Sequence, residues 1–299
     1  MRCVCSIYEE SNKDKEAYEK HIKLKDMARR QKTLDKERYA GDKSTVVLTV
    51  DLEAVLLAPA LKASALYYRT KLACHNYTIY DLHSHDSKCY FWHEGEGGLD
   101  ADTFATCLLD YLNNNERCKA ASTIIVYSDG CTYQNRNKVL ANALYDFCCK
   151  TKKTVTLKWE RALEDKKIYV PSNYKTYIEE ARPKQPYKVE YLKHDFFKTY
   201  TDLTYYSTIR PGHKVGDRVV TDIRQLRYKD GSLEYKLDYC ESDFLPLPQR
   251  CKENTGSIRR KYAETPKIKK SKYDDLQALK AVLPQDCHAF YDALPHYTA

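Results

Sequence analysis

Two short apolar runs, each ending on an aspartate, constrain the fold of this chain more than any other feature. The first runs from Val46 to Asp51, and the second runs from Ile124 to Asp129. Both are rich in β-branched residues and short enough to be buried strands. A carboxylate at the end of a buried parallel strand points into the crevice where α/β sheets bind ligands. If the two strands are neighbours, the aspartates form half of a divalent-metal site.

The composition predicts a protein with a substantial core and a mildly basic surface. The chain has 299 residues, 42% of them hydrophobic, and a net charge of +8. This length allows one large or two modest domains. The charge is compatible with a polyanionic partner but does not require one.

The cysteines and the hydropathy pattern bear on the compartment. None of the 12 cysteines belongs to a CxxC pair, and many lie inside apolar runs, as is typical of free thiols in a reducing compartment. The sequence contains neither a signal peptide nor an apolar run of membrane-spanning length. We therefore expect a nuclear or cytoplasmic protein with no membrane partner.

The expected elements follow one another in the order β-β-β-α-β-α-β. Strands are predicted at 45–52, 65–80, 88–93, 123–128 and 154–159, and helices at 100–112 and 136–150. The first three strands make an antiparallel meander, and the first helix then returns the chain parallel to strand 45–52. In that topology, strands 45–52 and 123–128 lie side by side. Asp51 and Asp129 would then share one cation.

This strand order with its two aspartates resembles the ribonuclease H-like (RNase H-like) fold of transposases, integrases and nucleases. The sequence also resembles the DUF7869-type domains, which are uncharacterised, abundant in arthropods and transposon-derived. The matching stretches are 49–59, 127–137, 206–217 and 222–224, and the most specific is Asp129 followed by Gln134-Asn135-Arg136-Asn137. The resemblance spans residues 45–250. It implies a mixed five-stranded α/β sheet, Mg²⁺ or Mn²⁺ as cofactor, and cleavage or strand transfer of nucleic acid.

The third acidic ligand of such a site is missing from its expected place. Phosphodiester transfer in this fold uses two divalent ions, which need more than two carboxylates. The family carries an acidic segment directly after the fifth strand. In this chain that segment is missing, because Trp159 is followed at once by Glu160 and by residues that resemble the part of the family sequence after the acidic segment. Glu160 and Glu164 would share a helix face and are the candidate substitutes. We expect the ancestral activity to be degenerate, and whether the chain is an enzyme stays open.

Polar and basic residues after Asp129 supply candidate nucleic-acid contacts. The amides could contact a phosphate backbone or cap the second helix, and we expect at least one of them to be a cap. The basic residues add positive charge where a helix N-terminus already favours an anion. Two further candidates come from the stretch 206–217. The full set is Gln134, Asn135, Arg136, Asn137, Lys138, Arg210 and Lys214.

The chain divides into four expected parts. These are an exposed, charged helical arm with a thin apolar stripe (1–44), the RNase H-like core truncated after its fifth strand (45–165), a tyrosine-rich basic appendage (166–250), and a basic linker with C-terminal helices (251–299). Within the appendage, Asp230-Gly231 predicts a hairpin turn. Tyrosines among basic residues can stack on nucleic-acid bases, or their rings can simply pack within the protein while their hydroxyl groups face water. The alternative function is therefore a non-catalytic module that binds nucleic acid or protein, and homo-oligomerisation also stays open.

Overall fold

Strands rich in β-branched and aromatic residues form the centre of the molecule. The computed structural model describes residues 15–60, 69–159, 175, 178–179, 185–240, 243–249 and 256–298. Its central strands are β1 (Thr45–Leu52), β3 (Leu72–Asp81), β4 (Ser87–His93), β5 (Thr123–Ser128) and β6 (Thr154–Trp159). Each of the five corresponds to a predicted strand. The short β2 (Leu56–Ala58) was not predicted, because three residues are too few to show a period.

The pairing of these strands follows the predicted topology. β1 is antiparallel to β3, and β3 is antiparallel to β4. β5 is parallel to β1 on its other side, and β6 is parallel to β5. The expected adjacency of strands 45–52 and 123–128 is therefore confirmed. The second strand begins later than predicted, at Leu72, and residues 61–68 lie outside the described part of the chain.

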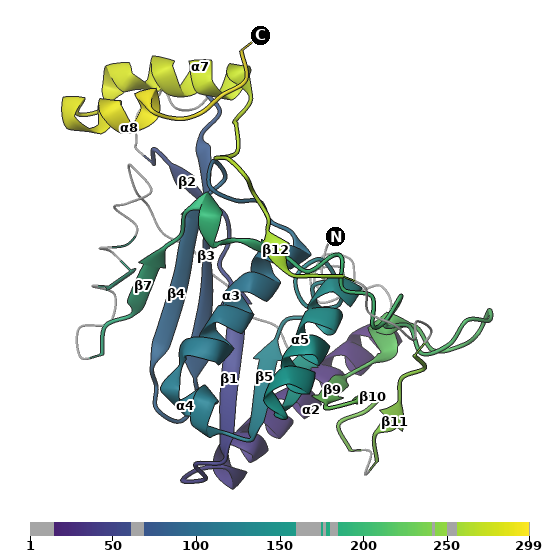
Figure 1. Cartoon of the computed structure of the whole chain (residues 1–299). Helices are drawn as coiled ribbons and strands as arrows, with labels where there is room; N and C mark the ends of the chain where they lie inside the picture. Colours follow the sequence, from purple (N-terminus) through teal and green to yellow (C-terminus); the bar gives the residue numbers. More distant parts are fainter. Residues whose placement is uncertain are drawn as a thin grey trace.

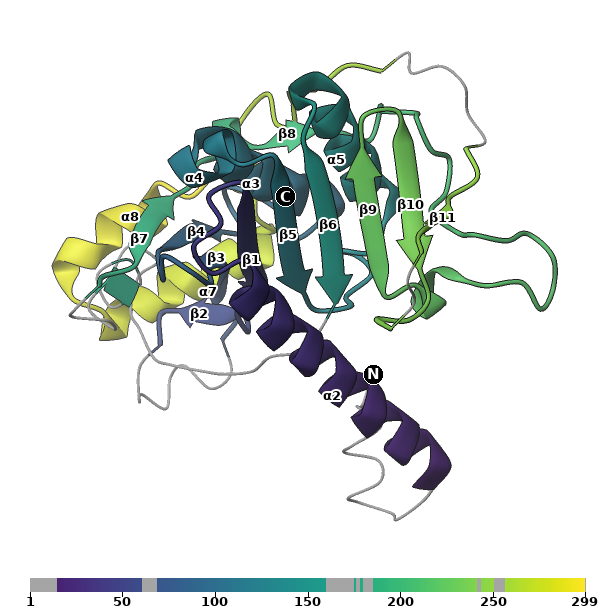
Figure 2. The same ribbon diagram turned by 90° about the horizontal axis from the view of Figure 1, so that it is seen from below.

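Helices cover both faces of the sheet (Figures 1 and 2). On one face lie α3 (Ala101–Asn114), α4 (Glu116–Ala120) and α5 (Lys138–Thr151). Their apolar sides pack on Val50, Trp92 and Val126 in the largest buried cluster. α2 (Lys15–Arg38) lies on the other face, above a smaller cluster that includes Tyr127. The molecule is thus a three-layer α/β protein around one mixed sheet.

The sheet is larger than the five strands expected from the sequence. The described part contains ten strands in one sheet, in the order β11-β10-β9-β6-β5-β1-β3-β4-β7, with β2 beside β3 (Figure 2). The added strands are β7 (Lys188–Tyr191), β9 (Gln225–Lys229), β10 (Ser232–Lys236) and β11 (Leu245–Pro246). The predicted Asp-Gly hairpin is β9–β10, with Gly231 at φ +73°. It pairs with β6 and so covers a strand edge that would otherwise be open.

Helix α2 is attached to the sheet through a buried polar contact. Asp35 is 2% exposed, and its carboxylate accepts hydrogen bonds from the Tyr127 hydroxyl at 2.6 Å and from the Lys158 ammonium. The adjacent Leu34 is instead 46% exposed. The arm was predicted as an exposed charged helix with a thin apolar stripe. Over its described residues it is a helix, but a carboxylate fixes it to the sheet.

The C-terminal residues form a separate small cluster beside the start of β3. α7 (Lys270–Leu279) and α8 (His288–Asp292) are the expected helical pair, and Pro284 lies between them. They enclose Leu72, and they lie at the β2 end of the sheet (Figure 1). The remaining short elements are β8 (Lys198–Thr199), β12 (Arg259–Arg260) and the 3-10 turns η2 (His194–Phe196), η3 (Val220–Asp222), η4 (Lys280–Val282) and η5 (Gln285–Cys287). Among the described helices, none has the length and apolarity that crossing a membrane requires.

Candidate functional site at the carboxylate edge

Asp51 and Asp129 lie at the same edge of the sheet, on neighbouring parallel strands. The β1–β5 register pairs Thr49 with Tyr127, and each aspartate comes two residues later in its own strand direction. Asp51 is the last residue but one of β1, and Asp129 follows the last residue of β5. Both are partly buried. The structure therefore brings together the two carboxylates that the sequence pattern singled out. We call this edge of the sheet the carboxylate edge.

The electrostatics of Asp51 indicate that the two charges are close. Burial is the largest effect that raises the pKa of Asp51, and the negative charge of Asp129 is the next, so that this pKa is about 6. Glu53 adds to the rise, while the Leu52 N–H and the Lys32 ammonium oppose it. Negative charge at this edge is thus only partly balanced. A site with an excess of carboxylate charge favours a cation.

The loop after β5 holds Asp129 in place. Asn135 Nδ2 donates to Asp129 Oδ1 at 2.8 Å, and the Cys131 N–H donates to the same oxygen at 3.3 Å. The described hydrogen bonds to this carboxylate therefore all reach Oδ1. Asn135 is buried, so its amide orients the aspartate and does not project toward solvent.

The other polar residues of the loop have different positions. Asn137 is the N-cap of α5, accepting from the Leu140 N–H at 2.9 Å and donating to the carbonyls of Thr132, Tyr133 and Gln134. The expectation that at least one amide caps the helix is confirmed. Gln134 is buried and donates to the Tyr133 hydroxyl. Lys138 is exposed at the first turn of α5.

The remaining predicted nucleic-acid residues occupy two places. Arg136 stacks on the ring of Trp159, with its guanidinium carbon 4.3 Å from the ring centroid, beside the carboxylate edge. Arg210 and Lys214 lie in a separate loop, where Arg210 Nη2 donates to the Lys214 carbonyl at 3.4 Å. The Lys214 side chain is exposed.

The described residues supply no complete multi-acid metal centre. No group of three or more His, Cys, Asp or Glu side chains in the described ranges could hold a metal ion. Glu53 is the nearest further acid to Asp51 by its electrostatic effect, but its Oε2 accepts a hydrogen bond from Asn76 at 2.9 Å. Glu160 and Glu164 lie outside the described residues. The site that can be described therefore has two carboxylates.

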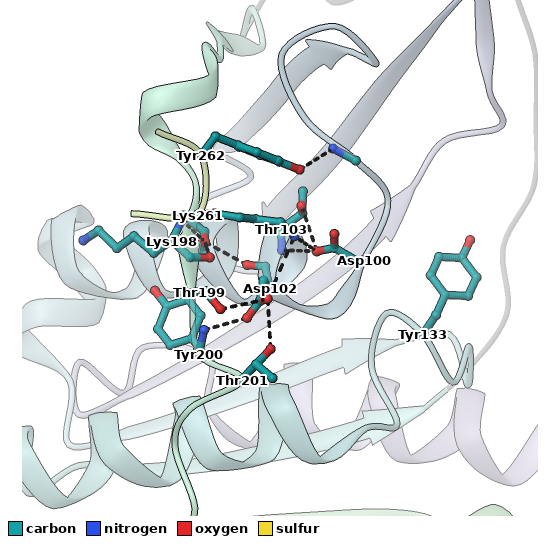
Figure 3. Close-up of polar contacts among 12 residues, drawn as sticks. Asp100, Asp102, Thr103, Tyr133, Lys198, Thr199, Tyr200, Thr201, Lys261 and Tyr262 are labelled. Atoms are coloured by element: carbon teal, nitrogen blue, oxygen red, sulfur yellow. Dashed lines mark hydrogen bonds and ion pairs between the residues drawn. The ribbon is translucent and has the colours of Figure 1, made fainter. Parts of the chain in front are cut away.

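A second acidic cluster, at the start of α3, serves a structural purpose (Figure 3). Asp102 accepts from the Tyr200 N–H at 2.6 Å and from the hydroxyls of Thr199 and Thr201 at 3.1 and 3.0 Å. Asp100 is the N-cap of α3 and pairs with Lys261. Donors thus surround both carboxylates. The cluster ties α3 to the strands β8 and β12.

Sequence reasoning missed two residues at the carboxylate edge. Lys32 comes from α2, 19 positions before Asp51, and its Nζ lies 3.5 Å from Thr49 Oγ1. Arg224 precedes β9 and lies close enough to Arg136 that its charge lowers the pKa of Arg136. Lys32 stands in no recognisable motif, and Arg224 ends the matching stretch 222–224 but was not among the candidate site residues. Both residues reach the edge only through tertiary packing.

Comparisons with known proteins returned no match. No family model matches the sequence, and no curated protein or solved structure is significantly similar to it. The fold and the site therefore define this molecule as a mixed α/β protein with a pair of acidic side chains at the carboxyl ends of two adjacent parallel strands.

Proposed function

We propose that this chain is a transposon-derived protein with an RNase H-like core, and that it binds nucleic acid at the carboxylate edge. Its ancestral activity is divalent-metal-dependent phosphodiester cleavage or strand transfer, and in this chain turnover is weak or lost. The observation that carries the proposal is the approach of Asp51 and Asp129 on strands β1 and β5, which is close enough to raise the pKa of Asp51.

The topology supports the RNase H-like part of the proposal. The order β4-β3-β1-β5-β6, with a meander on one side and parallel crossovers on the other, is the order expected for that fold. The resemblance placed one acid at the end of the first strand and one after the fourth. Asp51 and Asp129 occupy those positions. A fold alone does not assign an activity, so the site residues must carry the argument.

Mg²⁺ or Mn²⁺ fits the donors in type but not in number. Both ions prefer carboxylate and water oxygens, and Asp51 and Asp129 would hold one of them. When bound, such an ion would polarise a phosphoryl oxygen and lower the pKa of a water molecule. The described residues offer no third acid, and the Lys32 ammonium competes with a metal ion for the negative charge of Asp51. We therefore expect weak binding of one ion.

Helix α2 provides a basic surface beside this edge. Asp35 lies beside Tyr127 and Lys32 beside Thr49, so the chain before Lys32 continues past the strand ends that carry the aspartates. Figure 2 shows this part of α2 extending beyond the sheet. The helix contains nine Lys or Arg and five Asp or Glu residues, and Lys23, Arg29 and Arg30 are exposed. Such a surface favours a polyanion.

The alternative is a binding module without any catalytic role, and the two-carboxylate site favours it over an active nuclease. Under this alternative, the carboxylate edge still binds nucleic acid, but adding metal ions does not lead to cleavage of the bound strand. A protein partner in place of nucleic acid is the other form of the alternative. The two forms differ in their response to salt, because phosphate contacts release counterions.

Two experiments test the proposal. In the first, binding of labelled DNA and RNA oligonucleotides is titrated at several salt concentrations, and we expect affinity to fall steeply as salt rises. In the second, cleavage and Mn²⁺ binding are measured for the wild type, Asp51→Asn and Asp129→Asn, the binding by titration calorimetry. We expect little cleavage, weak Mn²⁺ binding by the wild type, and none by the variants. Equal Mn²⁺ binding by all three proteins would contradict the proposal of a metal site at Asp51 and Asp129. The absence of nucleic-acid binding would contradict the proposal that nucleic acid is the partner.

A further inference from the structure

Two arginines converge on one backbone carbonyl beside the carboxylate edge. Arg224 Nη1 donates to the Thr221 carbonyl at 2.7 Å, and Arg136 Nη1 donates to the same oxygen at 3.4 Å. Arg136 comes from the loop before α5, whereas Arg224 comes from the segment between η3 and β9. The ring of Trp159, at the end of β6, supports the Arg136 guanidinium from one side.

The positive charge of this pair is not neutralised by an ion pair within the described residues. The arginines that form ion pairs there are Arg69, Arg117, Arg227 and Arg259. Burial and, next, repulsion by Arg224 lower the pKa of Arg136 to about 10, although the charges of Tyr239 and Asp129 oppose this shift. The structure thus places two guanidinium groups together, although like charges repel each other.

Hydrogen-bonding capacity also remains unused at this position. Nε of Arg136 is buried and has no hydrogen-bond partner. Nη2 of Arg136 lies against Gly130, where a Cβ would be 3.0 Å away, so a residue without a side chain makes room for it. Buried donors without partners cost free energy, which an acceptor bound at the site would recover.

A phosphate group fits these donors best. Paired guanidinium forks match the oxygens of a phosphate, and Arg is the preferred residue for this contact. The 14-residue helix α5 begins at Lys138, two residues after Arg136, and a helix N-terminus favours an anion. Asp129 is close to Arg136 in the same loop, so an anion held here would lie beside the two carboxylates.

We propose that Arg136 and Arg224 form a phosphate-binding site that holds one backbone phosphate of a nucleic acid next to Asp51 and Asp129. This inference rests on the proposed function, since it specifies how the same edge recognises its partner. Trp159 is a positioning residue, because it acts by orienting Arg136.

The test measures oligonucleotide binding by fluorescence anisotropy over a range of salt concentrations. The proteins are the wild type, Arg136→Gln, Arg224→Gln, the double variant, and Arg260→Gln on the exposed strand β12. Arg260→Gln is the control, since it removes one positive charge, as each single variant does. We expect the double variant to lose roughly tenfold or more in affinity, because a charge-assisted contact is lost. Its salt slope should fall by about one, since one phosphate is no longer neutralised. Arg260→Gln should remain close to the wild type.

Stability measurements separate a ligand contact from a structural role. Arg224→Gln removes the repulsion on Arg136, so in the free protein the melting temperature should stay unchanged or rise while affinity falls. A melting temperature that falls together with affinity would overturn the inference. If Arg136→Gln proves unstable because its packing on Trp159 is lost, then Arg224→Gln and Arg136→Lys test the same contact.

A second arm uses inorganic pyrophosphate, with melting temperature and tryptophan fluorescence as readouts at constant ionic strength. If the oligonucleotide binds equally to the wild type and the double variant, the inference is overturned and the proposed function stands. If pyrophosphate stabilises the wild type but not the double variant, while no oligonucleotide binds, the phosphate comes from a free ligand. That result would overturn the nucleic-acid assignment in both proposals.

Discussion

The hydroxyl group of Tyr127, on strand β5, donates a hydrogen bond of 2.6 Å to the buried carboxylate of Asp35, on helix α2. Lys158 on β6 pairs with the same carboxylate, and Gln31 Nε2 donates to its other oxygen at 3.0 Å. Asp35 and Lys158 are 2% and 5% exposed. This contact positions α2, and with it Lys32, at the carboxylate edge.

We predict that Asp35→Ala destabilises the protein by about 3–5 kcal/mol, because it leaves the Lys158 charge buried without a partner. Tyr127→Phe should cost less, about 1–2 kcal/mol, since Asp35 keeps its contacts with Lys158 and Gln31. Urea unfolding followed by circular dichroism measures both changes. A loss below about 1 kcal/mol for Asp35→Ala would show that α2 does not depend on this contact.

We predict that Asp51→Asn stabilises the metal-free protein above pH 6. The pKa of Asp51 is raised to about 6, so the folded state binds the proton more tightly than the unfolded chain. The contribution of Asp51 to the stability of the folded state is fully present below about pH 4 and is lost as the pH rises through 6. After allowance for solvent screening, the variant should gain about 1 kcal/mol at pH 8 and little at pH 4.

The control for that prediction is Asp275→Asn. Hydrogen bonds from Thr70 and Arg69 lower the pKa of Asp275 to about 2. Its contribution is present above about pH 4 and is lost as the pH falls through 2, so this variant should lose stability at pH 8. Changes in the urea midpoint of opposite sign for the two variants, each relative to the wild type at pH 8, would support the interpretation. Changes of the same sign would contradict it.

We predict that the protein loses stability as the pH falls from about 6.5 to 4. Burial, and next the charge of Lys272, lower the pKa of His75 to about 4. Burial, and next the charge of His75, lower the pKa of His93 to about 4. The unfolded chain takes up these protons at a higher pH than the folded protein, which costs roughly 2 kcal/mol per histidine.

The variant His75→Leu should flatten this pH dependence, because Nδ1 of His75 is buried without a partner and little is lost by removing it. His213→Leu, in an exposed loop, is the control and should keep the wild-type profile. Urea midpoints between pH 4 and 8 provide the measurement. An unchanged profile for His75→Leu would show that another group titrates.

We predict that Asn137→Ala destabilises the protein by about 1–2 kcal/mol, because it removes the N-cap of α5 and three hydrogen bonds to loop carbonyls. Asn137→Asp keeps the capping oxygen and should cost less. If Asn137→Ala instead weakens oligonucleotide binding without any loss of stability, the residue contacts the ligand and is not a structural cap.

The local sequence pattern determined the central strands and the approximate position of the site. Short runs rich in apolar and β-branched residues predicted 45–52, 123–128 and 154–159 with their observed bounds, because a strand buried on both faces is apolar over most of its length. Parallel pairing of β1 with β5 then placed Asp51 and Asp129 at one edge. The Asp-Gly turn likewise predicted the hairpin β9–β10.

Long-range packing decided the rest. Nothing in the local pattern indicates that the hairpin pairs with β6, that Asp35 meets Lys158 across 123 positions, or that Arg224 lies beside Arg136. These contacts depend on which strand edges and buried charges remain to be satisfied after the central sheet has formed. The sequence by itself thus determined where two acids lie, and the tertiary structure decided which basic residues surround them.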